Sequence, residues 1–207
     1  MFPSLQATIQ ALIAQNVATP LPEDRVALLT PIAEMVGAKQ AAGDPVRMIF
    51  ICTHNSRRSH LSQVWAHAAA HYHGVPGVWT FSGGTEATAF NPNAVQALTD
   101  QGFVVTRESD GANPRYRVVF DPAEPAAAAF SKRYQDEPNP RAGFTAVMTC
   151  TEADAGCPIV SGAEHRFSLP YQDPKVSDGS GREPEIYRER ADQIAREMLF
   201  LFDKARR

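Results

Sequence analysis

The chain has 207 residues, of which 43% are hydrophobic, and this is enough for one domain with a sound core and a small added subdomain. Its formal net charge of −3 argues against nucleic acid or an anionic membrane as the main partner, and no apolar run approaches the ~20 residues that span a bilayer. The N-terminus lacks a signal-peptide pattern and the three cysteines form no disulfide framework, so we expect a cytoplasmic protein with reduced, catalytic or metal-binding thiols.

The first 43 residues are predicted to form a helical extension. Residues 4–15 and 23–40 carry apolar side chains at helical spacing, with a proline-containing break between them. Gly43-Asp44-Pro45 marks the boundary to the main domain, which we place at residues 44–207. A packing cap or a dimer contact is the simpler role for the extension, and a lid or a regulatory role is the alternative.

The most informative stretch begins at residue 46. An apolar run that ends at Ile51 predicts a buried strand, and apolar residues at helical spacing from Leu61 to Ala68 predict a helix. Between them lie Cys52 and the loop Thr53, His54, Asn55, Ser56, Arg57, Arg58 and Ser59. At such a junction several backbone NH groups lack helical partners and point, with the positive end of the helix dipole, into one concavity. We therefore predict an anion-binding loop.

Cys52 begins this loop and Arg58 lies six positions later, in a C-x5-R-S pattern. The NH groups, the helix N-terminus and the guanidinium all favour the thiolate, so Cys52 is the candidate nucleophile. The planar fork of Arg58 suits two oxygens of a tetrahedral oxyanion. Asn55 and Ser59 are expected to brace the loop and donate to the thiolate. A buried strand-end cysteine with a chance arginine is the alternative interpretation.

These residues resemble the low-molecular-weight protein tyrosine phosphatases and the thioredoxin-coupled arsenate reductases that share their fold. Both groups carry C-x4-C-R-S directly after the first strand, whereas Arg57 stands here in place of the second cysteine, which protects the nucleophile of the phosphatases against oxidation. The resemblance implies a three-layer α/β fold around a central parallel sheet of about four strands, and it covers roughly residues 46–203. The larger phosphatases and the rhodaneses fit less well, because their cysteine–arginine loop typically contains glycine and lies far from the first strand.

A second strand is predicted over residues 78–82, which gives a parallel strand–helix–strand unit. Ser82-Gly83-Gly84-Thr85 then resembles the segment that lies beside the phosphate loop in this family, and Ser82 is expected to bond to Asn55. An ordinary glycine turn is the alternative. Asn91-Pro92 opens a further helix that ends at Gly102.

The resemblance leaves an insertion between about residues 106 and 143 unexplained. Strands are predicted at 103–105 and 115–120, and the proline-flanked alanine run within 121–141 is interpreted as a short helix over the site. Lys132 and Arg133 on that helix are candidate substrate contacts, although a solvated helix face is the simpler interpretation.

A buried strand at residues 144–149 leads to the other two cysteines. The run Cys150-Thr151-Glu152-Ala153-Asp154-Ala155-Gly156-Cys157-Pro158 resembles the redox segment of the arsenate reductases, C-[ST]-[DE]-A-D-x-x-C-P. Two inert buried cysteines are one alternative. Zinc binding with His165 is another, but no C-x2-C pair is present.

The last core strand is predicted at residues 167–169, and Asp173-Pro174 follows it. This pair resembles the general-acid loop of the family, in which the aspartic acid protonates the departing oxygen. Plain turns at Asp173-Pro174 and Asp178-Gly179 are the alternative. Residues 184–205 form a predicted amphipathic helix that closes the core.

Three functions remain open at this point. The resemblance implies arsenate reduction, in which Cys52 attacks arsenate, Cys150 forms a disulfide with Cys52, and Cys157 carries that disulfide outward to thioredoxin. Hydrolysis of phosphomonoesters through a phosphocysteine at Cys52 is the alternative, although no aromatic wall for phosphotyrosine follows Asp173-Pro174. An oxyanion-binding or redox-sensing module without turnover is the third. The expected ligand is a small oxyanion, arsenate or a phosphate ester, with no cofactor, metal, nucleic acid or membrane.

Overall fold

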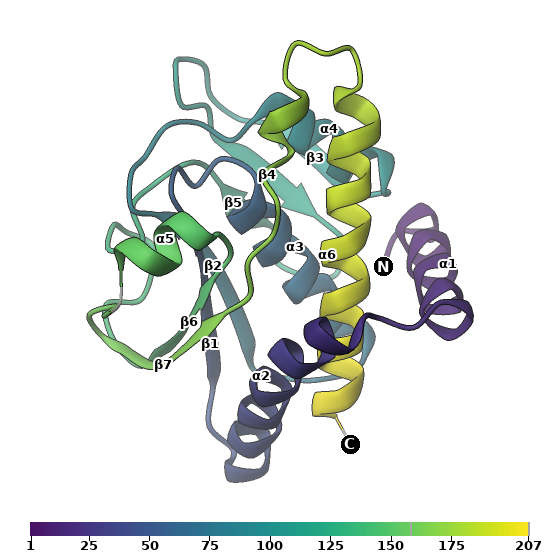
Figure 1. Cartoon of the computed structure of the whole chain (residues 1–207), viewed down its shortest axis with the longest axis vertical. Coiled ribbons are helices and arrows are strands. Elements are labelled where there is room, and N and C mark those ends of the chain that lie inside the picture. The colour runs from purple at the N-terminus through teal and green to yellow at the C-terminus, as the bar shows by residue number, and fades with distance from the viewer. Residues whose placement is uncertain (158, 207) are drawn as a thin grey trace.

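A four-stranded parallel sheet forms the centre of the molecule (Figure 1). The computed structural model describes residues 1–157 and 159–206. The strand order is β2-β1-β6-β7, and the strands are β1 (Val46–Cys52), β2 (Val78–Gly84), β6 (Phe144–Met148) and β7 (Ala163–Ser168). Because the strands are parallel, all four carboxyl ends lie at one edge of the sheet. The predicted α/β class with about four parallel strands is confirmed.

The two faces of the sheet are covered unequally. Alternate side chains of β1 point to opposite faces, so Met48 and Phe50 join the large helical core while Ile49 and Ile51 join a smaller cluster. The large core is built on α3 (Arg58–Tyr72), α4 (Pro92–Asp100) and the long α6 (Glu183–Ala205). The smaller cluster is covered by the short α5 (Thr151–Gly156) and by loops.

The N-terminal residues form the two predicted helices, α1 (Pro3–Ala18) and α2 (Glu23–Ala42). Both pack against α6 in the large core, as Figure 1 shows. Arg25 of α2 forms a two-pronged ion pair with the buried Glu197 of α6 (2.9 and 2.7 Å), and its Nη1 donates to the carbonyl of Pro170 at 2.9 Å. The extension therefore supports the chain just before Asp173.

The prediction for the insertion was wrong in one part. Residues 103–129 contain a second, antiparallel sheet of order β3-β4-β5, made of β3 (Val104–Arg107), β4 (Tyr116–Val119) and β5 (Ala127–Ala129). The alanine run is β5, paired with β4, and is not a helix. The prolines on either side leave too few residues for a stable helix, whereas pairing with β4 satisfies the backbone directly.

The segment after β5 docks onto the end of β2. Gly84 donates to the carbonyl of Lys132 at 2.8 Å, and Tyr134 donates to the carbonyl of Gly84 at 2.9 Å. A Cβ atom on Gly83 would overlap the backbone of Tyr134, so the close approach requires glycine. Lys132 is 4% exposed, so its interpretation as part of a solvated face was wrong, while Arg133 is exposed and pairs with Asp136.

None of the helices in the described part of the chain combines the length and the apolar character that crossing a bilayer requires.

Candidate active site

The loop between β1 and α3 surrounds the sulfur of Cys52. Cys52 ends β1 and is 3% exposed, and α3 begins at Arg58. Asn55 adopts a left-handed conformation with φ of 45°, a conformation that asparagine tolerates better than most residues, and this turns the loop. The backbone amides of residues 54–57 donate to no other described residue. These amides and the first turn of α3 are free to bind an anion.

Side chains within the loop fix the surroundings of the sulfur. The hydroxyl of Ser59 lies 3.2 Å from Cys52 Sγ, and Asn55 Nδ2 donates to that hydroxyl at 2.9 Å. Because the Ser59 oxygen already accepts from Asn55, its proton is available to the sulfur. Asn55 Oδ1 accepts from the amide of Lys132 at 3.0 Å, so the insertion holds the same asparagine from the other side.

The insertion also holds the outer part of the loop. Ser131 Oγ donates to the carbonyl of His54 at 2.8 Å and accepts from the amide of Thr88 at 2.8 Å. Thr88 Oγ1 donates to the same His54 carbonyl at 3.2 Å. Sequence reasoning missed Ser131 and Thr88, because only the docking of the insertion brings them to the loop.

Ser82 does not bond to Asn55, so this expectation was wrong. The side-chain amide of Asn55 bonds to the Ser59 hydroxyl and to the backbone amide of Lys132. Ser82 Oγ lies instead 3.2 Å from Nδ1 of His60. His60 is fully buried and stacks on Phe90. Burial, together with the charge of Lys132, lowers the pKa of His60 well below its usual value, so this ring is neutral.

Arg58 connects the loop to the segment after β7. It is 5% exposed, its Nη1 donates to the carbonyl of Tyr171 at 3.0 Å, and its Nη2 donates to Asp173 Oδ2 at 2.6 Å. Its Nε is buried and has no hydrogen-bond partner among the described residues. A buried donor on a charged group normally has a partner, so Nε is a donor available to a bound anion.

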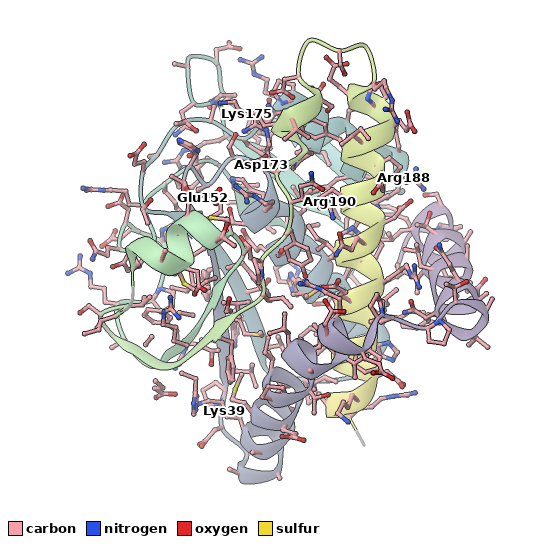
Figure 2. All side chains as sticks on the ribbon, viewed as in Figure 1. Lys39, Glu152, Asp173, Lys175, Arg188 and Arg190 are labelled. Carbon is pink, nitrogen blue, oxygen red and sulfur yellow. The ribbon has the colours of Figure 1, made fainter. Side chains whose placement is uncertain are left out.

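Asp173 stands at the start of a short 3-10 helix, η1 (Pro174–Ser177). Its Oδ1 accepts from the amide of Lys175 at 3.1 Å, and its other oxygen accepts from Arg58. Glu152 of α5 approaches Arg58 from the other side, with 3.8 Å between Oε2 and Nη1. Figure 2 shows Asp173 and Glu152 at the same end of the molecule, on the two segments that flank the loop.

Cys150 emerges from β6 beside the Cys52 loop. Its sulfur is fully buried, lies 3.5 Å from Thr53 Oγ1 and accepts from the amide of Ala153 at 3.3 Å. Burial raises the pKa of the Cys150 thiol, as does the nearby Cys52, whereas Thr53, Ala153 and the charge of Arg58 oppose the increase. The structure therefore brings Cys150 to the nucleophile loop.

Cys157 lies at the opposite end of α5 and is half-buried. It lies seven positions after Cys150, which corresponds to about 10 Å along a helix. Arg166 of β7 donates to the Cys157 carbonyl at 3.1 Å and to Asp154 Oδ1 at 2.6 Å, so it holds this end of α5 in place. Cys52, Cys150 and Cys157 form no disulfide with one another, and Pro158, which ended the predicted redox segment, lies outside the described residues.

No group of three or more His, Cys, Asp or Glu side chains within residues 1–157 and 159–206 is arranged to hold a metal ion. His165, the additional ligand in the zinc alternative, stacks on the ring of Phe167.

The fold is that of the low-molecular-weight protein tyrosine phosphatases and of arsenate reductases, and it presents a cysteine–arginine loop at the carboxyl edge of the sheet. A low-molecular-weight phosphotyrosine phosphatase of Vibrio cholerae O395 is 16% identical, with a TM-score of 0.50 over 75% of this chain and 93% of its own. A mutant of YwlE from Bacillus subtilis is 16% identical, with a TM-score of 0.52 over 78% and 99%. An arsenate reductase from Archaeoglobus fulgidus is 18% identical, with a TM-score of 0.50 over 75% and 98%.

No family model matches the chain, and no curated protein is significantly similar to it in sequence. At such low identities the likeness establishes the fold alone.

Proposed function

We propose that the protein is a cysteine-thiolate enzyme that acts on a tetrahedral oxyanion, and that its reaction is the reduction of arsenate. The observation that carries the proposal is the unpartnered Nε of the buried Arg58, a residue of the same loop as the free amides of residues 54–57 and Cys52. An oxyanion bound there would satisfy all of these donors at once. Its central atom would lie within reach of the sulfur.

In the first step Cys52 attacks the arsenic atom and forms a sulfur–arsenic bond. One oxygen departs as hydroxide and takes a proton from Asp173, so that water leaves. Asp173 is bonded to Arg58 in the free enzyme, and an incoming anion competes for that guanidinium. Release from Arg58 would then leave the Asp173 carboxyl free to turn toward the departing oxygen.

In the second step Cys150 attacks the sulfur of Cys52. The sulfur–arsenic bond breaks, arsenic keeps the electron pair and leaves as arsenite, and a Cys52–Cys150 disulfide forms. The position of Cys150 against Thr53 supports this step. Burial raises the pKa of the Cys150 thiol overall, and the charge of Arg58 opposes this increase and so helps the thiolate, which is the attacking species.

In the third step Cys157 attacks Cys150 and frees Cys52. The two sulfurs start at opposite ends of α5, so this helix has to unwind, and the new disulfide would then be more exposed. We propose thioredoxin as the reductant of that disulfide and the cytoplasm, where thiols stay reduced, as the location.

A second candidate function is the hydrolysis of phosphomonoesters. Cys52, Arg58 and Asp173 are assembled without any contribution from Cys157, and they suffice to form and hydrolyse a phosphocysteine. Lys175 and the exposed Val176 follow Asp173-Pro174, so no aromatic wall for phosphotyrosine is found there. Other phosphate esters suit this surface better.

Two assays on single variants test these functions. Arsenate reduction coupled to thioredoxin is expected in the wild type and is expected to disappear in Cys52→Ser, Cys150→Ser and Cys157→Ser. Release of p-nitrophenol from its phosphate, if present, is expected to need only Cys52. Phosphatase activity without arsenate reduction would overturn the first proposal in favour of the second. Phosphate binding with neither activity would leave an oxyanion-binding module and overturn both.

A further inference from the structure

We infer that Arg57 is a positioning residue that holds the segment carrying Asp173 against the nucleophile loop, and that it acts through Tyr187 and Asp178. This inference rests on the proposed function, because it assigns to Arg57 a task in the protonation step. Arg57 occupies the loop position where the resembling families usually carry a second cysteine.

The side chain of Arg57 enters a closed triangle of hydrogen bonds. Its Nε donates to the hydroxyl of Tyr187 at 2.7 Å, and its Nη2 donates to Asp178 Oδ2 at 3.0 Å. The Tyr187 hydroxyl in turn donates to Asp178 Oδ1 at 2.7 Å. Each of the three side chains therefore contacts the other two.

This triangle fixes the far end of the segment that Asp173 begins. Asp173 precedes η1 and Asp178 follows it, and the turn is closed by the amide of Asp178 on the carbonyl of Lys175 at 3.0 Å. Two consecutive arginines thus hold the two ends of one short helix. Arg58 binds Asp173, and Arg57 binds Asp178.

Burial and charge keep the triangle intact. Burial alone would lower the pKa of Arg57, but the Tyr187 hydroxyl and the carboxylates of Asp173 and Asp178 raise it overall, so the guanidinium stays charged. Burial raises the pKa of Tyr187 to about 12, so its hydroxyl keeps the proton that it donates to Asp178. Tyr187 of α6 is fully buried and anchors the triangle to the core.

The contacts of Arg57 with Tyr187 and Asp178 matter most when an anion is bound. An oxyanion that takes Arg58 removes the strongest contact of Asp173, since the Arg57 Nε lies 3.9 Å from Asp173 Oδ1 and makes no hydrogen bond to it. The triangle contains no contact with Arg58, so it stays in place when Arg58 binds the anion. Asp173 then keeps its position through the backbone of η1, which is the geometry that protonation of a leaving group requires.

The test compares two aryl phosphates whose leaving groups differ in basicity. A phenyl leaving group needs protonation much more than p-nitrophenyl does, so a misplaced acid slows phenyl phosphate selectively. Because general acid catalysis is worth roughly 10²–10⁴-fold, we expect Arg57→Lys and Tyr187→Phe to lose about tenfold more kcat/KM on phenyl phosphate than on p-nitrophenyl phosphate. Inhibition by inorganic phosphate should stay unchanged, because the loop amides and Arg58 are intact.

Arg182→Lys is the matched control, since Arg182 pairs with Glu185 on the surface of the same helix as Tyr187. It should behave as the wild type. An equal loss on both substrates in Arg57→Lys would overturn the inference, since it would show a general effect on the fold. So would the absence of any loss.

A second measurement does not depend on turnover. Amide hydrogen exchange over residues 173–178, in saturating inorganic phosphate, should be faster in Arg57→Lys and Tyr187→Phe than in the wild type and in Arg182→Lys. If the wild type turns over neither aryl phosphates nor arsenate, the proposed function fails. The exchange rates still decide whether Arg57 holds the segment, and unchanged rates overturn that claim.

Discussion

Two neighbouring strands each lead to a cysteine followed by a helix, yet these two junctions are built differently. β1 and β6 are paired in parallel, with Ile51 opposite Met148, so Cys52 and Cys150 leave the sheet side by side. The chain after Cys52 enters the 15-residue α3, which is buried along most of its length. The chain after Cys150 enters the six-residue α5, in which Ala153 is the buried residue.

The Cys52 end is also held by more buried contacts than the Cys150 end. The Cys52 loop is held from inside by Asn55 and Ser59 and from outside by Ser131. The far end of α5 is held by a partly exposed pair, Arg166 and Asp154. Short, weakly buried elements are the ones that open locally at low cost. The Cys52 end therefore suits a fixed anion geometry, while the Cys150 end suits a thiol that has to move in the proposed reaction.

The largest effect is expected from Arg58 in the Cys52 loop. Arg58→Lys keeps the charge but loses the planar fork, including the free Nε. We expect kcat/KM for the oxyanion substrate to fall by at least about 10²-fold, because the transition state loses a preorganised donor pair. Steady-state kinetics on the folded variant measure this. A fall of less than threefold would mean that Arg58 supports the fold and contributes nothing to anion binding.

The second prediction concerns the buried lysine that flanks the same loop. Burial lowers the pKa of Lys132 from 10.5 to about 8, so between these values the unfolded chain binds more protons than the native one. Wild-type stability should therefore gain from Lys132 as the pH rises through this window, by up to about 3 kcal/mol. Below pH 8 the native state carries the full cost of the buried charge.

Urea unfolding of the wild type and of Lys132→Met at pH 7 and pH 10 measures this effect, because the difference between the two proteins cancels other titrations. The variant should be the more stable protein at pH 7, and its advantage should shrink at pH 10. A constant difference at both pH values would show that Lys132 keeps its ordinary pKa in the native state.

The third prediction tests the outer support of the loop. Ser131→Ala removes a hydroxyl that serves both the His54 carbonyl and the Thr88 amide. We expect a loss of about 1 kcal/mol in stability, because two partly buried groups each lose one hydrogen bond, together with weaker inhibition by phosphate. Thermal unfolding and inhibition constants measure the two effects, with the exposed Ser161→Ala as the control. Unaltered phosphate inhibition would show that the loop holds its shape without the insertion.

The smallest effect is expected at α5, where Arg166 holds the end that carries Cys157. Arg166→Gln removes the ion pair to Asp154 and the bond to the Cys157 carbonyl. Since a partly exposed pair with its hydrogen bonds is worth about 1 kcal/mol, the Cys150–Cys157 disulfide should form roughly threefold to tenfold faster under a fixed oxidant. Timed thiol trapping follows the reaction, and Arg141→Gln on the surface serves as the control. An unchanged rate would mean that α5 opens by a route that leaves Arg166 in place.

The sequence was most informative where local pattern and final structure agree. The apolar run before Cys52 and the helical spacing after it predict β1 and α3, because both elements bury the faces that their periodicity indicates. Asn91-Pro92 likewise marks the start of α4, where the Asn91 side chain accepts from the amide of Asn93. The role proposed for Asp173 rests on a resemblance to known families and could not be worked out from spacing.

The sequence was least informative in the insertion. The alanines of β5 would suit a helix equally well, and only their pairing with β4 decides the matter. The burial of Lys132 and the true partner of Ser82 also depend on segments that are distant in sequence. Tertiary contacts of this kind leave no periodic signal.

The glycine pair at the end of β2 has a consequence for how this molecule relates to smaller versions of the fold. Gly83 lies so close to the 132–134 segment that a Cβ atom there would overlap the backbone of Tyr134. A Cβ atom on Gly84 would instead meet the backbone of Thr53, Asn55 and Glu86, so this second glycine serves the Cys52 loop. Transplanting the segment onto a minimal scaffold should accordingly succeed only where the residue equivalent to Gly83 has no side chain.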